Sequence, residues 1–289
     1  MLRKSLLLAL GVLAPICLTG LWVLHGDCCP IKAALTNTAE PTDSCCQAET
    51  QNDATVEAQF VTASVFPLST VNEPQGATGD ASVKGTVKFE GTAPAREKIN
   101  MEADAVCAKL HAEALTKEDL IVGKDGGVKN VFVYVKKGID GKYDAPKDAF
   151  VLDQKGCQYI PHVFGVVAGQ KITVKNSDAT THNVHSFGKK NKAINQAQPA
   201  GSKEIEVDWK TSEMSMAIKC DMHPWMSSIC HIVKHPFFAI TDENGKFEIK
   251  NLPAGDYTIE ALAEGMPAQT VEVKVAAKEA RDANFTFKK

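Results

Sequence analysis

Three residue types that bind soft metals lie within seven positions, in the stretch Cys220-Asp221-Met222-His223-Pro224-Trp225-Met226. Thiolate and thioether ligands select Cu(I), imidazole accepts either copper oxidation state, and a weak axial methionine tunes the reduction potential. Zinc would prefer a harder fourth ligand than a thioether, which favours copper. A trigonal copper site takes two histidines and one cysteine, so one more imidazole must come from another strand.

His182 is the candidate for that second imidazole. It follows an alternating apolar run, residues 169–176, and a short polar turn, which is the pattern of a strand, a turn and a second strand. We therefore predict that copper is the cofactor and that its ligands are His182, Cys220, His223 and Met226.

Five motifs within residues 149–233 resemble the blue-copper (cupredoxin, plastocyanin-like) family: Tyr159-x-Pro161, Val166-x-x-Gly169, Val174-x-Asn176, His182-Asn183-Val184 and Cys220-x-x-His223-x-x-Met226. The resemblance implies a Greek-key β-sandwich whose four ligand residues form a type 1 copper site for single-electron transfer. The spacing between His223 and Met226 is shorter than in most plastocyanin-like members. It is closer to the dinuclear copper domain of cytochrome oxidase, which has a second cysteine that this loop lacks.

Side-chain alternation predicts how the ligand strands are oriented. The apolar face of the strand before the loop contains Met214, Met216 and Ile218, and it ends at Cys220. His182 and His185 lie three positions apart, so they should face opposite ways unless a bulge intervenes. We expect electrons to enter and leave through an exposed edge of His223, beside Pro224 and Trp225.

Other polar residues near the ligands have open roles. Four further histidines could build a second copper centre or be isolated surface residues: His162, His185, His231 and His235. Asn183 is expected to hydrogen-bond to the ligand loop and hold it rigid. Cys107 and Cys157 are candidates for a disulfide that would tie two modules together, as expected in an exported protein.

The N-terminal segment predicts export. Residues 1–26 place Arg3 and Lys4 before an uncharged stretch from Ser5 to Leu24, which indicates a retained membrane anchor or a cleaved signal peptide. Residues 27–80 have the composition of a flexible linker. Two cysteine pairs in this linker could bind a soft metal, form disulfides or carry lipid: Cys28, Cys29, Cys45 and Cys46.

The flanking regions resemble the carboxypeptidase regulatory-like (transthyretin-like) β-sandwich. The resemblance rests on Gly85-x-Val87 and on the run from Asp242-x-x-Gly245-x-Phe247 to Leu252-Pro253-x-Gly255-x-Tyr257. About fifty C-terminal residues are few for an independent sandwich. We therefore expect residues 81–140 and 236–289 to form one sandwich, with a cupredoxin-like copper domain inserted at residues 141–235. A tandem arrangement is the alternative.

Together these patterns predict an all-β protein and narrow its function. The formal net charge of -3 argues against a nucleic-acid-binding protein, which would need a clustered basic surface. We find no catalytic triad, paired-carboxylate hydrolase pattern or phosphate loop, so we do not expect an enzyme. The expected function is an electron carrier, in the periplasm or on the outer face of the membrane, that exchanges electrons with redox proteins of the cell envelope. The alternatives are a copper storage, delivery or sensing protein, and a cell-surface, carbohydrate-binding-like sandwich with a structural metal.

Overall fold

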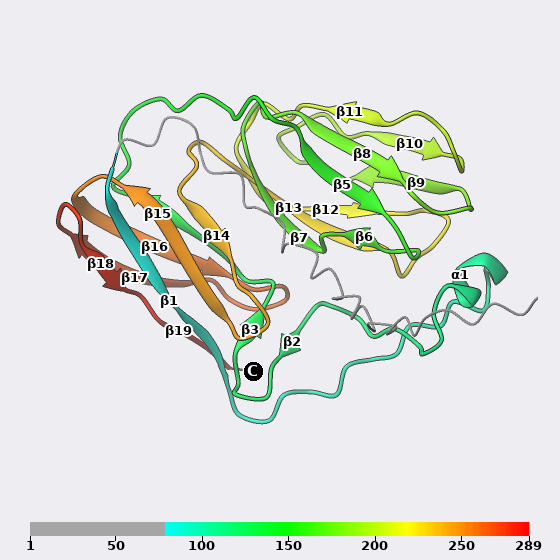
Figure 1. Cartoon of the computed structure of the whole chain (residues 1–289), viewed down its shortest axis with the longest axis horizontal. Coiled ribbons are helices and arrows are strands. Elements are labelled where there is room, and N and C mark those ends of the chain that lie inside the picture. Colours follow the sequence, from blue (N-terminus) through cyan, green and yellow to red (C-terminus); the bar gives the residue numbers. More distant parts are fainter. Residues whose placement is uncertain (1–78, 289) are drawn as a thin grey trace, which may run out of the picture. The chain divides into compact units, whose positions relative to one another are not determined.

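The computed structural model describes residues 79–288, whose regular secondary structure is almost entirely β-strand (Figure 1). The all-β prediction is confirmed. The predicted N-terminal membrane anchor or signal peptide and nearly all of the linker lie outside the described residues. Within residues 79–288, no helix is long and apolar enough to cross a bilayer.

The first sandwich pairs strands from both ends of the described chain. One sheet has the order β15-β1-β18, with β19 also paired to β1, and the other has the order β14-β4-β16-β17. Early strands thus pair with late ones in both sheets. The predicted domain boundaries stay a prediction. The strands are β1 (Ala81–Glu90), β4 (Phe132–Lys137), β14 (Phe238–Ile240), β15 (Lys246–Leu252), β16 (Gly255–Leu262), β17 (Gln269–Val275), β18 (Ala280–Asp282) and β19 (Phe285–Lys288).

Strand β4 is buried on both faces, as its continuous apolar sequence predicts. Val133 and Val135 are fully buried in the core of the first sandwich. Phe132 and Tyr134 point the other way, into a small cluster with Val163 and the neighbouring apolar residues. The two faces of this one strand therefore serve two separate hydrophobic clusters.

The turn before β15 shows why the motif Asp242-x-x-Gly245 has an aspartate and a glycine at these two positions. Asp242 accepts hydrogen bonds at Oδ1 from the backbone N–H groups of Asn244 (2.9 Å) and Lys246 (2.8 Å). Gly245 adopts φ 73°, and a Cβ there would lie 2.3 Å from the carbonyl oxygen of Val87. Only glycine fits this turn without moving β1.

The second sandwich holds the predicted copper ligands. Its sheets have the orders β10-β9-β12-β13-β7 and β11-β8-β5-β6. A third, two-stranded sheet of β2 and β3 packs on the first sandwich instead, since Val128 of β3 lies in the core of that sandwich. The strands are β5 (Phe150–Gln154), β6 (Tyr159–Ile160), β7 (Val163–Val167), β8 (Ile172–Asn176), β9 (His182–Ser186), β10 (Asn195–Gln198), β11 (Ile205–Val207), β12 (Glu213–Lys219) and β13 (Ser227–Val233), with β2 (Ile121–Val122) and β3 (Val128–Lys129) in the third sheet. The helix α1 (Ala105–Lys109) precedes them in the chain.

The alternation in β12 is broken at one point. Met216, Ile218 and Cys220 are buried in the core of the second sandwich, as predicted. Met214 packs instead against the small cluster around Phe132. The cause is a β-bulge, a register shift between Glu213 and Met216, where Ser215 adopts φ 53°. The bulge interrupts the alternation, so Met214 and Met216 point to different faces of the sheet.

A buried histidine in β13 should make the fold sensitive to acid. His231 is 3% exposed and stacks on Phe132 with ring centroids 4.2 Å apart. Burial lowers the pKa of His231 to about 3. The unfolded chain takes up this proton below its ordinary pKa of about 6.5 while the folded chain does not, so stability is lost as the pH falls.

We expect His231 alone to cost about 2 kcal/mol of unfolding free energy between pH 7.5 and pH 5. Urea unfolding at both pH values, in the wild type and in His231→Gln, measures this difference. The variant should lose that part of the pH dependence, whatever its stability at pH 7.5. An identical pH dependence in both proteins would show that the pKa of His231 is nearly the same in the folded and unfolded states.

Candidate metal centre

The pairing of β9 with β12 brings the predicted ligands to one end of the second sandwich. The two strands run antiparallel with Lys219 opposite His185, so the chain beyond β12 continues toward the start of β9. His182 is the first residue of β9, and Cys220 follows β12 directly. His223 lies in the loop that leads to β13.

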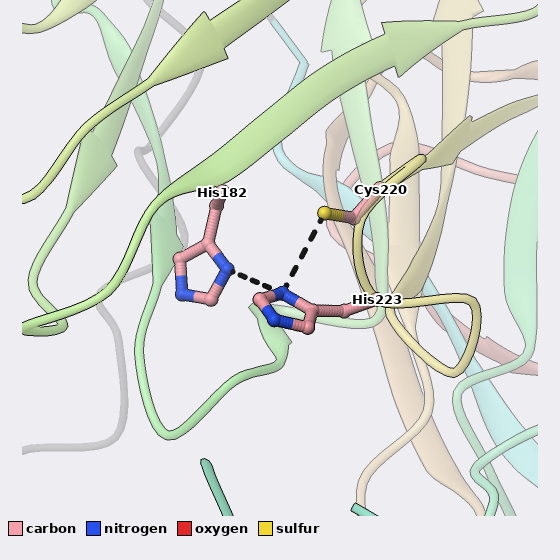
Figure 2. A group of neighbouring side chains, drawn as sticks. All are labelled: His182, Cys220 and His223. Carbon is pink, nitrogen blue, oxygen red and sulfur yellow. Dashed lines mark hydrogen bonds between the residues drawn. The ribbon is translucent and has the colours of Figure 1, made fainter. Parts of the chain in front are cut away.

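Three of the predicted ligands converge on one point (Figure 2). His182 Nδ1 lies 3.0 Å from His223 Nδ1, and His223 Nδ1 lies 3.8 Å from Cys220 Sγ. Ligand atoms of all three residues lie within 4.8 Å of one another, and all three side chains are buried. A thiol and two imidazoles facing one another in a dry core is the arrangement that a His2Cys copper site requires.

Hydrogen bonds hold the ligand loop in its shape. The Cys220 N–H donates to the carbonyl of Met226 (3.3 Å), and the Met226 N–H donates to the carbonyl of His223 (2.9 Å). Asn183 Oδ1 accepts from the backbone N–H of Asp221 at 2.8 Å, which confirms the predicted contact between Asn183 and the loop. Met226 is buried in the same core cluster as Cys220, and its part as axial ligand stays a prediction.

Each ligand imidazole binds a carboxylate through its outer nitrogen. His182 Nε2 lies 2.8 Å from Asp178 Oδ2, and His223 Nε2 lies 3.1 Å from Asp104 Oδ2. A carboxylate only accepts hydrogen bonds, so Nε2 carries the proton on each ring. The two Nδ1 atoms then face each other, and a proton or a metal cation between them keeps their lone pairs from meeting.

The electrostatics of the site also suit a cation. Burial raises the pKa of the Cys220 thiol, but the His182 side chain and backbone N–H groups outweigh it and leave that pKa below its ordinary value. Burial likewise opposes protonation of His182, yet the neighbouring Asp178 and Cys220 raise its pKa to about 9. A proton thus takes the place that a metal would fill, and metal binding would release it. The donor set fits copper, because a thiolate and imidazoles suit both of its oxidation states.

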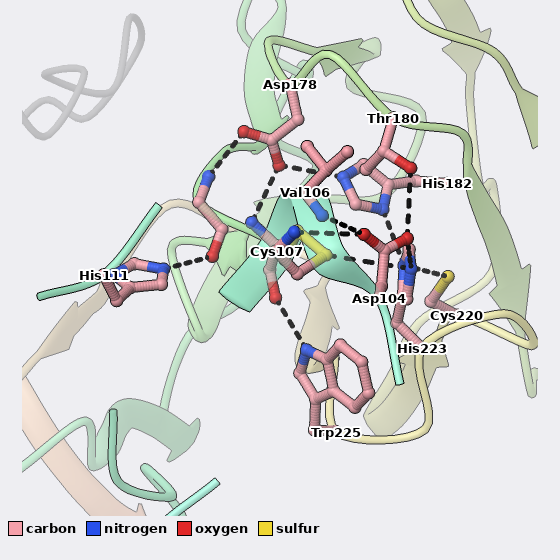
Figure 3. Close-up of a disulfide and its surroundings, with 12 residues drawn as sticks. Asp104, Val106, Cys107, His111, Asp178, Thr180, His182, Cys220, His223 and Trp225 are labelled. Carbon is pink, nitrogen blue, oxygen red and sulfur yellow. Dashed lines mark hydrogen bonds and ion pairs between the residues drawn. A yellow bond between two sulfur atoms is a disulfide. The ribbon is translucent and has the colours of Figure 1, made fainter. Parts of the chain in front are cut away.

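A disulfide lies directly beside the two histidines (Figure 3). Cys107 and Cys157 are bonded, which confirms the predicted pair. The N–H of Cys157 donates to Asp178 Oδ2 at 2.7 Å, and its carbonyl accepts from Trp225 Nε1 at 3.2 Å. Trp225 is thus held beside the disulfide, with its side chain partly buried.

The predicted exposed edge of His223 is wrong. His223 is only 3% exposed, because Asp104 and the disulfide cover its outer nitrogen. His185 faces away from the site, as alternation predicts, and binds Asp221 at 2.9 Å.

The other histidines do not form a second centre within residues 79–288. His162 binds Glu264, His231 stacks on Phe132, and His235 binds the carbonyl of Val135. In that part of the chain, every cluster able to hold a metal includes His182 or His223.

Two further residues of the site, Asp104 and Asp178, were not predicted from the sequence. Asp178 precedes His182 by only four positions. That short spacing could have predicted a hydrogen bond between its carboxylate and the imidazole. Asp104 has no such signal, since it lies 119 positions before His223 and only the fold brings the two together.

Residues 234–288 match the carboxypeptidase regulatory-like domain family. No match is found among curated proteins.

Among solved structures, the chain is similar to a purple cupredoxin from Nitrosopumilus maritimus, with 21% identity, a TM-score of 0.25, and coverage of 29% of this chain and 99% of that one. It is also similar to the P94A mutant of amicyanin, with 22% identity, a TM-score of 0.26, and coverage of 29% and 81%. A copper-containing nitrite reductase from Thermus scotoductus gives 13% identity and a TM-score of 0.28, with coverage of 33% and 25%. These likenesses are weak, so we base the function on the side chains of the site.

Proposed function

We propose that this chain is an exported type 1 copper protein that carries single electrons between redox partners of the cell envelope, tethered to the membrane by residues 1–26. The observation that carries the proposal is the buried convergence of His182, Cys220 and His223. The disulfide supports an oxidising compartment, the periplasm or the outer face of the membrane. We propose a carrier and not an enzyme, since burial of all three ligand side chains suits electron transfer without a bound substrate.

The ligand residues would hold copper, which supplies a one-electron couple when bound. The three donors come from a rigid β-sandwich and a hydrogen-bonded loop, so their positions need not change with the charge of the metal. Burial of all three keeps water from the ligands. The Asp178 carboxylate fixes the ring of His182 with Nδ1 toward the centre.

Electrochemistry of the copper-loaded full-length protein tests the carrier function. We expect one reversible one-electron couple, and copper that stays bound through repeated cycles in the presence of a Cu(I) chelator such as bicinchoninate. Complete transfer of Cu(I) to the chelator on each reduction would contradict the carrier and support storage or delivery. Copper that cannot be reduced reversibly would leave a structural metal in a surface-binding sandwich.

The axial role of Met226 has its own test. Met226→Leu should keep copper bound and raise the reduction potential, because three donors are enough for Cu(I), whereas Cu(II) is stabilised by a fourth, axial donor. Met222→Leu is the matched control, since Met222 lies in the same loop but is 53% exposed. Equal potentials in the two variants would remove Met226 from the ligand set.

A further inference from the structure

A closed arm of the chain, residues 97–117, lies against the predicted copper centre. Its base is closed by hydrogen bonds from the Ile99 N–H to the Leu115 carbonyl (2.7 Å) and from the Lys117 N–H to the Glu97 carbonyl (2.9 Å). Its tip carries α1. Ile99, Met101 and Cys107 of the arm are buried in the core of the second sandwich, so the arm is packed in place and not merely tethered.

Asp104 at the tip of the arm uses both carboxylate oxygens. Its Oδ1 caps α1 by accepting from the N–H groups of Val106 (2.8 Å) and Cys107 (3.0 Å). Its Oδ2 accepts from His223 Nε2 at 3.1 Å and from Thr180 Oγ1 at 3.3 Å. The cap therefore fixes the orientation of the carboxylate, and that orientation directs Oδ2 at the imidazole (Figure 3).

The disulfide locks this arrangement at a second point. Cys107 is in α1, three residues from Asp104, and its Sγ lies 3.8 Å from His223 Nε2. Its partner Cys157 lies beside Asp178, which holds the other imidazole. The arm is thus bonded to the segment that orients His182 while it touches His223 itself.

We propose that Asp104 is a positioning residue of the copper centre, which acts through His223 and is delivered by the disulfide-bonded arm from outside the copper domain. It holds the ring of His223 with Nδ1 toward Cys220 and His182, and it shields the outer edge of the ring from water. This inference rests on the proposed function. The arm would then do more than pack against the core, because it would supply a residue that orients a ligand of the metal centre.

Asp104→Ser separates positioning from helix capping. Serine is as good an N-cap as aspartate, but its shorter side chain cannot reach His223. Asp104→Asn is the second variant, because it keeps the size of the side chain and removes its charge. Glu102→Gln is the matched control, since Glu102 lies on the same arm, is exposed, and bonds only to Asn100.

The first readout uses the metal-free protein, labelled with nitrogen-15. The Nε2 proton of His223 should be protected from exchange with water in the wild type and in Glu102→Gln, and should exchange freely in Asp104→Ser. The second readout is copper binding. Asp104→Ser should lower Cu(II) affinity roughly 10–100-fold, as loss of a carboxylate partner of a ligand histidine does elsewhere. It should also let added azide perturb the copper spectrum.

The two readouts separate this inference from the proposed function. Proton exchange, Cu(II) affinity and azide response in Asp104→Ser and Asp104→Asn that all equal those of Glu102→Gln would overturn the role of Asp104, even in a blue copper protein. If the wild type gave no blue copper spectrum, the proposed function would fail. The exchange of the His223 proton would then still decide whether Asp104 holds the ring.

Discussion

Replacing Cys220 with serine should abolish the thiolate-to-copper absorption and tight binding of Cu(II). The thiol is the one soft donor of the buried His2Cys set, and its lowered pKa makes it ready to bind as a thiolate. A serine hydroxyl would not ionise there. Titration of the variant with Cu(II), followed by its visible spectrum and by competition with a chelator, measures the effect.

Cys230 provides the control for this experiment. Cys220 and Cys230 are the free cysteines of residues 79–288, and both are buried. Burial raises the pKa of Cys230 well above its ordinary value, so it stays a neutral thiol in the core. Cys230→Ala should keep the copper band in full. If Cys220→Ser kept the wild-type spectrum, the ligand set would be wrong.

Removing the disulfide should cost about 4 kcal/mol of unfolding free energy, from the chain entropy that a loop of this length restores to the unfolded state. The loop is long because Cys107 and Cys157 are 50 positions apart. Denaturant unfolding of the double variant Cys107→Ser, Cys157→Ser against the wild type measures the loss.

Wild-type protein reduced with a thiol reagent should unfold at the same denaturant concentration as the double variant. Copper affinity should fall as well, because the arm that carries Asp104 loses its bond to Cys157. A loss below about 1 kcal/mol would mean that packing alone holds the arm, since the expected effect of a native disulfide is several times larger.

How far the sequence could predict the site depends on where each residue lies in the chain. Cys220 and His223 belong to one loop, and His182 starts a strand with a clear pattern, so local spacing and alternation were enough to predict that these three side chains meet. Asp104 could not be found in this way. Its contact with His223 depends on how a separate arm packs onto the sandwich, which no local pattern records.

For the fold as well, features set by neighbouring residues could be predicted, and features set by residues far away in the chain could not. The alternation and turn residues around Gly245 and Tyr257 identified the flanking strands, because each of these turns is specified within a few positions. Met214 was misplaced, since the bulge at Ser215 interrupts a strand whose sequence alternates without a break. The exposure of His223 was also wrong, because the chain that covers it lies more than a hundred positions away.

The type 1 copper centre is tested most directly by the optical and EPR spectra of the full-length protein with one equivalent of Cu(II), recorded before and after reduction. We predict an intense visible thiolate-to-copper band and a compressed hyperfine pattern, both bleached by reduction and restored by oxidation. A pale tetragonal copper spectrum without that band would contradict a type 1 centre at His182, Cys220 and His223.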